Sequence, residues 1–192
     1  MQFEAATSRI LKILQESLPG KLCYHCFEHV EDVYRAAERL SDAEGVTETE
    51  RQLLLTAVCY HDAGFMRGTD NHEQHSCDMV REDLGSFGYT PEDIEAICSM
   101  IMATRVPQDP RARLEEIICD ADLDYLGRDD FFEVGDRLYR ELLGAGRVTD
   151  QHEWNRIQVH FLENHRYFTR TAVNTRQPAK LRNLEMLRTL LP

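Results

Sequence analysis

The sequence predicts an all-α fold of about nine helices, and three observations support this prediction. Apolar residues recur every three or four positions along nearly the whole chain, as they do in amphipathic helices. No segment alternates apolar and polar residues in the pattern of a half-buried strand. Residues that start and stop helices also divide the chain repeatedly. We therefore expect a helical bundle with no significant sheet.

Four helices are predicted in the first 85 residues. Pro19 and Gly20 end the first helix, and Thr47 begins the third because Glu50 completes a capping box with it. The fourth opens with Asp70 and Glu73, which are three residues apart like Thr47 and Glu50. The predicted helices span about residues 7–18, 24–40, 47–61 and 70–85.

The rest of the chain predicts five further helices. Thr90 precedes Pro91, a residue favoured at the first helical position, and Gly144 and Gly146 end a later helix. No repeat, low-complexity tract or linker interrupts the pattern, so we expect one domain over residues 1–192. The predicted helices span about residues 90–104, 111–126, 130–143, 150–175 and 178–190.

The composition restricts the class of protein. Of 192 residues, 42% are hydrophobic, which is typical of a globular domain. No apolar run approaches the roughly 20 residues that cross a bilayer, and the N-terminus has no signal-peptide pattern. A net charge of −12 argues against binding to nucleic-acid polymers or anionic membranes. We expect a cytoplasmic protein with reduced cysteines. Cys23-x-x-Cys26, without a second such pair, is only weak evidence for a redox or zinc site.

His61 and Asp62 end the apolar run of residues 53–60 and form the most informative pair in the chain. A carboxylate beside a buried helix requires a cation or another polar partner. His25 and His29 are four residues apart, which places them on one face of the second predicted helix. A lone histidine on such a face is usually an ordinary core residue. Together with His61 and Asp62, however, the histidines of this helix favour a metal site.

The sixth predicted helix carries three aspartates, and its periodicity distinguishes them. Asp122 shares a face with apolar residues, whereas the face of Asp120 is mainly charged. We therefore expect Asp122 to point inward as a metal ligand. Asp120 and Asp124 are expected either to support the ligands or to lie at the surface.

The order of these residues resembles the HD-domain superfamily of metal-dependent phosphohydrolases. Residues 24–33 are also similar to a stretch of cyclic-nucleotide phosphodiesterases, although Cys26 stands where those proteins usually have asparagine. The resemblance covers about residues 24–126, the expected metal-site core, and residues 127–192 would complete an HD-type bundle. The four residues in this order are His29, His61, Asp62 and Asp122.

The resemblance implies that these four residues bind one divalent metal. Two imidazoles and two carboxylates suit manganese, iron, nickel, zinc or magnesium. The metal would polarise phosphorus and lower the pKa of the attacking water, with Asp62 in the catalytic set. His25 matches the histidine that protonates the leaving oxygen in phosphodiesterases, and it fits equally well as a histidine that hydrogen-bonds a carboxylate. His72 is the other candidate for proton transfer.

The sequence also departs from relatives that hold two metals. Phe65 stands where such relatives have histidine, and residues 100–105 lack a histidine pair. These differences favour a mononuclear centre over a diiron oxygenase. Phosphate oxygens require cations, and the candidates are Arg105, Arg128 and Lys180.

We therefore expect an enzyme that hydrolyses a nucleotide or another small phosphoester. The alternative is a degenerate HD domain that binds a metal or nucleotide without turnover and regulates a partner. A homodimer through apolar stripes on the terminal helices is compatible with the sequence.

Overall fold

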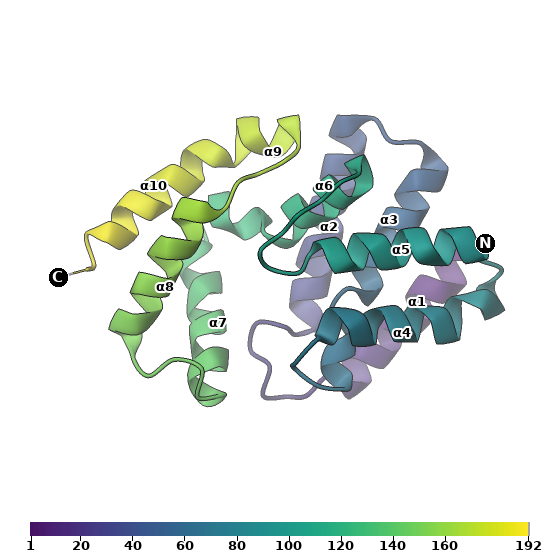
Figure 1. The fold of residues 1–192 in the computed structure, drawn as a ribbon, viewed down its shortest axis with the longest axis horizontal. Helices are drawn as coiled ribbons and strands as arrows, with labels where there is room; N and C mark the ends of the chain where they lie inside the picture. The colour runs from purple at the N-terminus through teal and green to yellow at the C-terminus, as the bar shows by residue number, and fades with distance from the viewer. Residues whose placement is uncertain (192) are drawn as a thin grey trace.

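A computed structural model describes residues 1–191, and Pro192, the last residue of the predicted domain, lies outside the described part. The described residues form helices and short 3₁₀ turns and contain no strand (Figure 1). The all-α prediction is confirmed. The helices are α1 (Phe3–Ser17), α2 (Phe27–Glu44), α3 (Glu48–Tyr60), α4 (His72–Asp83), α5 (Pro91–Ala103), α6 (Arg113–Asp122), α7 (Phe131–Gly144), α8 (Gln151–Asn164), α9 (Arg170–Thr175) and α10 (Gln177–Arg188); the 3₁₀ turns are η1 (Ala63–Met66), η2 (Leu84–Phe87) and η3 (Asp124–Gly127).

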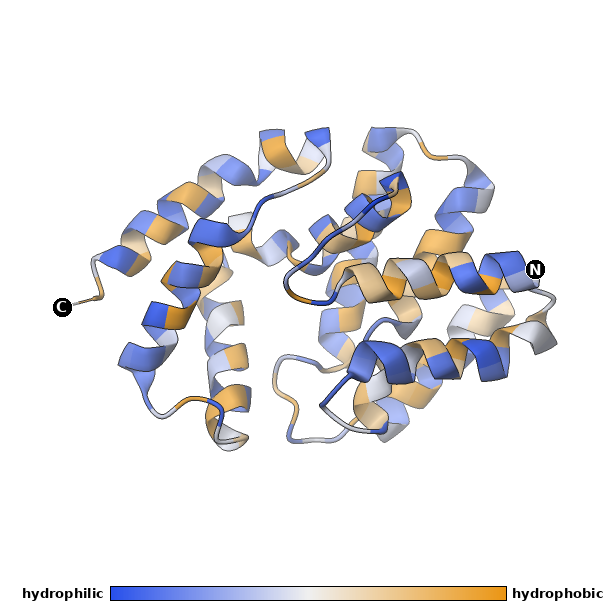
Figure 2. Cartoon of the chain, in the orientation of Figure 1, coloured by the Kyte–Doolittle hydropathy of each residue, from blue (hydrophilic) through white to orange (hydrophobic). Residues whose placement is uncertain are grey.

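Helix α3 lies at the centre of the first group of helices. It packs against α1, α2, α5 and α6, and residues 54–60 are buried on every side, as expected for a helix that is apolar all round. Helices α7, α8 and α10 form a second group beside the first (Figure 1). Most outer helices carry hydrophobic residues along one side and hydrophilic residues along the other (Figure 2). None of the helices described is long and apolar enough to span a membrane.

The capping box predicted for α3 is present, and α5 has a second one. Thr47 and Glu50 exchange hydrogen bonds at the start of α3, and Thr90 and Asp93 do the same at α5. Such caps satisfy the backbone N–H groups that the first turn of a helix leaves unpaired. The local sequence therefore fixes the starts of these two helices.

Several predicted helix boundaries differ from the structure. The second helix begins at Phe27 rather than Tyr24, so His25 lies in the preceding turn and does not share a helix face with His29. Asp70 does not cap α4, because Asn71 precedes this helix in the left-handed conformation with φ of 56°.

The predicted helix over residues 150–175 is divided in two. Asp120 accepts hydrogen bonds from the backbone N–H groups of Phe168 and Thr169, at 2.9 and 2.7 Å. These bonds hold an extended segment between α8 and α9. A contact between residues so distant in the sequence overrides the local helical pattern.

Candidate metal centre

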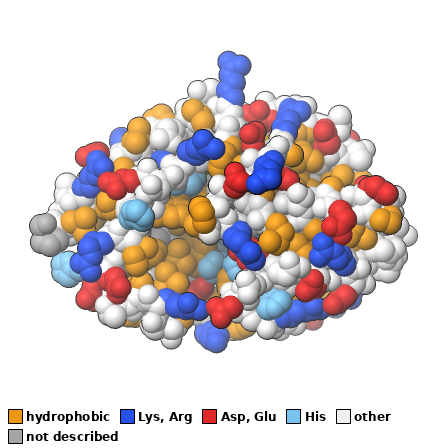
Figure 3. Space-filling view, viewed as in Figure 1, with side chains coloured by type: hydrophobic (Ala, Val, Ile, Leu, Met, Phe, Trp, Pro, Cys, Tyr) orange, Lys and Arg blue, Asp and Glu red, His pale blue; other side chains and the backbone are white. Residues whose placement is uncertain are grey.

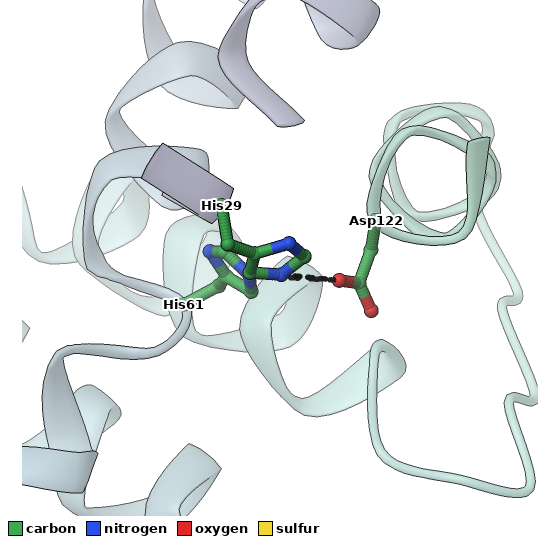
Figure 4. Close-up of side chains that lie close together, drawn as sticks. All are labelled: His29, His61 and Asp122. Atoms are coloured by element: carbon green, nitrogen blue, oxygen red, sulfur yellow. Dashed lines mark hydrogen bonds and ion pairs between the residues drawn. The ribbon is translucent and has the colours of Figure 1, made fainter. Parts of the chain in front are cut away.

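Three helix ends bring the predicted ligands together. His29 lies in the first turn of α2, His61 directly follows α3, and Asp122 is the last residue of α6. Figure 4 shows the two imidazoles and this carboxylate turned toward one another. One ligand atom from each lies within 4.8 Å of the others. His29 Nε2 is 3.2 Å from Asp122 Oδ1, and His61 Nε2 is 3.6 Å from the same oxygen.

Asp62 completes the cluster from the turn after α3. Its Oδ2 atom lies 3.5 Å from His29 Nε2 and 3.3 Å from His61 Nε2. Its side chain is 6% exposed. The four residues thus present two imidazole nitrogens and two carboxylates to one small buried space.

The hydrogen bonding of His61 leaves one nitrogen free for a cation. Its Nδ1 atom lies 2.8 Å from the backbone oxygen of Val58. A carbonyl only accepts, so Nδ1 carries the proton and Nε2 of the neutral ring presents a lone pair. In the described part of the chain, neither His61 Nε2 nor Asp62 Oδ2 has a hydrogen-bond partner, and both atoms are buried. Two electron-rich atoms facing each other without a partner fit a bound cation.

The electrostatics of the cluster also favour positive charge. Burial lowers the pKa of His61, but the charges of Asp62 and Asp122 outweigh burial and raise this pKa to about 9. The carboxylates therefore attract a positive charge to Nε2, and a metal bound there would take the place of a proton. Burial raises the pKa of Asp122, yet the hydrogen bond from His29 and the nearby charge of His61 lower it to about 2. Asp62 is likewise buried, and the charge of His61 holds its pKa far below the usual range. The donor set therefore fits a divalent metal held by these four residues.

His25 lies beside the cluster and is positioned by α7. Its Nδ1 atom is 2.5 Å from Glu141 Oε1, and Glu141 also accepts the backbone N–H groups of Tyr24 and His25. The Phe65 ring contacts the rings of both His25 and His72, with centroid distances of 4.3 and 4.1 Å. Burial lowers the pKa of His25, but the hydrogen bond to Glu141 and the charges of the nearby carboxylates together outweigh burial, so this pKa is raised.

His72 occupies the first position of α4, and its Nε2 atom is 3.5 Å from Asp62 Oδ1. Both candidates for proton transfer therefore lie next to the predicted ligands.

Asp120 and Asp124 are not surface residues, which corrects one of the two expectations for them. Asp120 is 0% exposed and binds the segment after α8; Asp124 is 2% exposed. Asp124 accepts hydrogen bonds from Arg39 and Arg176, each at 2.7 Å. Asp122 is more exposed than either neighbour, with 15% of its side chain accessible, because it faces a cavity.

A cavity of about 370 Å³ opens from the cluster, and we call it the metal-facing cavity. Asp62 and Asp122 line one end, together with His25, His72 and Glu73. Figure 3 shows a hollow in the middle of this face, with hydrophobic side chains around it and histidine within it. The apolar part of the lining is Leu123, Leu126, Phe131, Leu138, Leu142, Trp154, Ile157, Phe161 and Leu162, with Val106 at the rim.

A second cavity of about 630 Å³ meets the first at His25, His72 and Leu142. It contains two cations that the sequence analysis missed, Lys21 and Arg147. Arg147 pairs with Asp70 at 2.8 Å. We call this space the basic cavity.

The predicted cations are placed differently. Arg105 lies 3.5 Å from Glu73, which lines the metal-facing cavity. Arg128 lies outside this cavity and is bound by Asp32 and Asp130, each at 2.8 Å. Lys180 is 1% exposed and lines neither cavity. Its ammonium donates to the backbone oxygen of His165 at 2.5 Å, so the prediction that it binds substrate is not supported.

The HD domain family matches residues 26–125, which is more than half of the chain. The chain belongs to the HD-domain family. This match begins just before α2 and ends after α6, so it contains all four residues of the cluster.

Two crystal structures are similar to this HD domain over almost their full length. A protein from Lactobacillus plantarum is 20% identical, with a TM-score of 0.70, and the match covers 99% of this chain and 97% of that one. Bacillus subtilis YpgQ, solved in complex with ADP, is also 20% identical, with a TM-score of 0.68 and coverage of 99% and 95%. No curated protein matches. These similarities confirm the HD-type fold, including the helices after residue 126.

Proposed function

We propose that this HD domain is a metal-dependent phosphohydrolase and that its substrate is a nucleotide or a similar small phosphoester. The observation that carries the proposal is the pair of buried, unpartnered atoms, His61 Nε2 and Asp62 Oδ2, at the end of an open cavity. Family membership and the ADP complex of YpgQ support the same reaction class and ligand.

His29, His61, Asp62 and Asp122 would hold the metal, one ion per chain. When bound, a divalent ion supplies Lewis acidity toward a phosphoryl oxygen and a nucleophilic water at neutral pH. The protein contributes the orientation of the ligands. The Val58 carbonyl holds the His61 ring through Nδ1, as outer hydrogen bonds commonly do for metal-binding histidines.

His25 is our candidate for protonating the leaving oxygen. Glu141 binds its Nδ1 atom, which leaves the opposite nitrogen available to a substrate in the metal-facing cavity. Its hydrogen bond to Glu141 contributes to a raised pKa, which favours the protonated ring that a general acid requires. His72 contacts the carboxylates of Asp62 and Glu73 instead, which suits a role in positioning Asp62.

The substrate's phosphate oxygens require positive charge near the cluster. The candidates are Lys21 and Arg147, which line the basic cavity, and Arg105, which pairs with Glu73 of the metal-facing cavity. The apolar walls of the metal-facing cavity would accept an uncharged part of the substrate.

The proposal is tested by replacing one metal ligand with a side chain of the same shape that lacks the negative charge. The Asp62→Asn variant should lose measurable hydrolysis of a panel of nucleotides assayed with Mn²⁺, while keeping its helical circular dichroism. Elemental analysis should show about one metal ion per wild-type chain and much less in the variant. Asp129→Asn changes an exposed aspartate in the same way and should leave activity unchanged. Full hydrolysis by Asp62→Asn with saturating Mn²⁺ would contradict the proposal.

A further inference from the structure

Two of the buried tyrosines differ from the others in their hydrogen bonding. A buried tyrosine hydroxyl usually has a partner in the protein, and three of the five have one. These bonds join Tyr60 to Asp83 at 2.5 Å, Tyr89 to Thr56 at 2.8 Å and Tyr167 to the backbone oxygen of Leu123 at 3.2 Å. In the described structure, the hydroxyls of Tyr24 and Tyr125 are bonded to no carboxylate and no backbone oxygen, although these side chains are also buried.

Both of these hydroxyls are open to the metal-facing cavity. Tyr24 and Tyr125 line this cavity together with Asp62 and Asp122. Neither hydroxyl oxygen is among the unpartnered side-chain atoms of residues 1–191 that are closed to water. A ligand in the cavity can therefore reach them.

The two tyrosines lie at the end of the cavity that carries the proposed metal ligands. The centre of the Tyr24 ring is 4.6 Å from that of His29, and Tyr125 follows Asp122 by three residues, in η3. The two tyrosine rings meet edge to face, with their centres 5.7 Å apart. Burial and the charge of Asp122 raise the pKa of Tyr125 above its usual range, so this phenol keeps its proton and remains a donor.

The structure holds both rings in place. Glu141 accepts the backbone N–H of Tyr24 at 2.9 Å. The Tyr125 ring is nearly parallel to that of Phe131, with an interplanar angle of 12° and a centre-to-centre distance of 6.1 Å. Donors that are already oriented stabilise charge on a bound group without the cost of reorganisation.

The charge of the cavity lining makes such donors necessary for an anionic substrate. Three carboxylates line the metal-facing cavity, those of Asp62, Glu73 and Asp122, and among the described residues no lysine or arginine does. The Thr104 hydroxyl also lines it, but this group donates to the backbone oxygen of Ile101 at 2.8 Å. The tyrosine hydroxyls are therefore uncharged donors placed where phosphate oxygens need them.

We propose that the hydroxyls of Tyr24 and Tyr125 bind the substrate's phosphoryl group, each donating a hydrogen bond to a nonbridging oxygen. Both tyrosines keep their protons throughout and act only as donors. Their part in catalysis rests on the proposed hydrolase function. Binding of a phosphate ion requires no turnover and can be measured separately.

Tyr125→Phe removes the hydroxyl and keeps the ring, and Tyr24→Phe does the same for the second donor. Calorimetry with inorganic phosphate, on the full chain loaded with Mn²⁺, measures binding without hydrolysis. Each variant should bind phosphate about tenfold to a hundredfold more weakly than the wild type, because a hydrogen bond to a charged group contributes about this factor. For the nucleotide that the wild type hydrolyses best, kcat/KM should fall by a similar factor.

Tyr34→Phe is the matched control. Tyr34 is half-buried on α2 and lines neither the metal-facing cavity nor the basic cavity, so phosphate affinity and kcat/KM should stay at the wild-type values. Elemental analysis should show the same manganese content in all three variants and the wild type. A lower content in both Tyr24→Phe and Tyr125→Phe would mean that these tyrosines support the metal ligands and do not bind phosphate.

Two further results would overturn the inference: no binding of phosphate by the wild type, or wild-type phosphate affinity in both tyrosine variants. Failure of the proposed function is distinguishable from either. Phosphate binding that depends on the two hydroxyls, in a protein that hydrolyses no phosphoester, would retain the inference and exclude the hydrolase. Hydrolysis that is undiminished in both variants would exclude the inference and retain the hydrolase.

Discussion

At the residue scale, the sequence identified the cluster but not what supports it. His29, His61, Asp62 and Asp122 could be selected because their residue types, their order and the apolar neighbours on their helix faces can be read from the sequence. The partner of His25 could not, since Glu141 is 116 residues away and lies on a helix with no motif. Asp120 shows the same limit. Its charged helix face suggested solvent exposure, but contacts with Phe168 and Thr169 bury it.

Glu141 gives a prediction at this scale. Glu141→Gln can still accept the backbone N–H groups of residues 24 and 25, but it lacks the charge that raises the pKa of His25. We expect kcat to fall by about tenfold to a hundredfold, the range for groups that orient functional histidines. If protonated His25 is required, activity falls as pH rises through its pKa. The high-pH limb of the kcat profile should therefore move to lower pH in the variant.

The control for this experiment lies on the same helix. Glu133→Gln changes an exposed carboxylate of α7, with 68% of its side chain accessible, and should alter neither kcat nor its pH profile. Metal content should be the same in both variants. A Glu141→Gln enzyme with the wild-type kcat and profile would show that Glu141 does not act through His25.

At the scale of helices and turns, the start of α3 was predictable, whereas the start of α4 and the break after α8 were not. Thr47 and Thr90 act through neighbours three residues away, so the local sequence contains the whole signal. The turn after α3 depends on packing instead. The backbone N–H of Gly64 donates to Ser76 Oγ at 2.8 Å, and Ser76 donates to the backbone oxygen of His61 at 2.7 Å. These bonds hold α4 against the turn that carries His61 and Asp62.

Gly64 is required by this close approach. A Cβ atom there would lie 1.9 Å from the backbone oxygen of His72, so Gly64→Ala must displace the start of α4. We expect the variant to lose roughly 1–3 kcal/mol of unfolding free energy, as overpacked cores do, and to bind metal more weakly. Thermal unfolding and metal titration test this.

Gly85→Ala is the matched control, since nothing lies within 4 Å of a Cβ atom at Gly85. Its stability should stay within about 0.5 kcal/mol of the wild type. Equal stability of the Gly64→Ala and Gly85→Ala variants would contradict the packing argument.

At the scale of the whole molecule, the two groups of helices contribute different parts of the site. Helices α2, α3 and α6 supply the cluster, and α7 and α8 supply much of the apolar wall of the metal-facing cavity. Periodicity predicted these helices but could not predict that α7 and α8 would face the cluster, because amphipathic helices can pack in many arrangements. The homodimer stays a prediction, and Leu181 and Met186, about half exposed on α10, are its candidate contacts.

The contact between His165, just after α8, and Lys180 on α10 predicts how the free energy of unfolding depends on pH. His165 has a pKa of about 3 in the folded protein and about 6.5 when unfolded. Because the folded state favours the neutral form of His165, the stabilisation from this residue is complete above about pH 6.5. It is lost as the pH falls toward 3 and the unfolded state takes up a proton. From pH 7 to 5 the wild type should lose about 1–2 kcal/mol of unfolding free energy more than His165→Gln, because glutamine does not titrate. Urea unfolding of both proteins at each pH isolates this difference, since their carboxylates are the same. His152→Gln removes an exposed histidine and should follow the wild type. If His165→Gln does so as well, the neutral buried imidazole does not link the C-terminal helices to pH, and Lys180 must face a different partner.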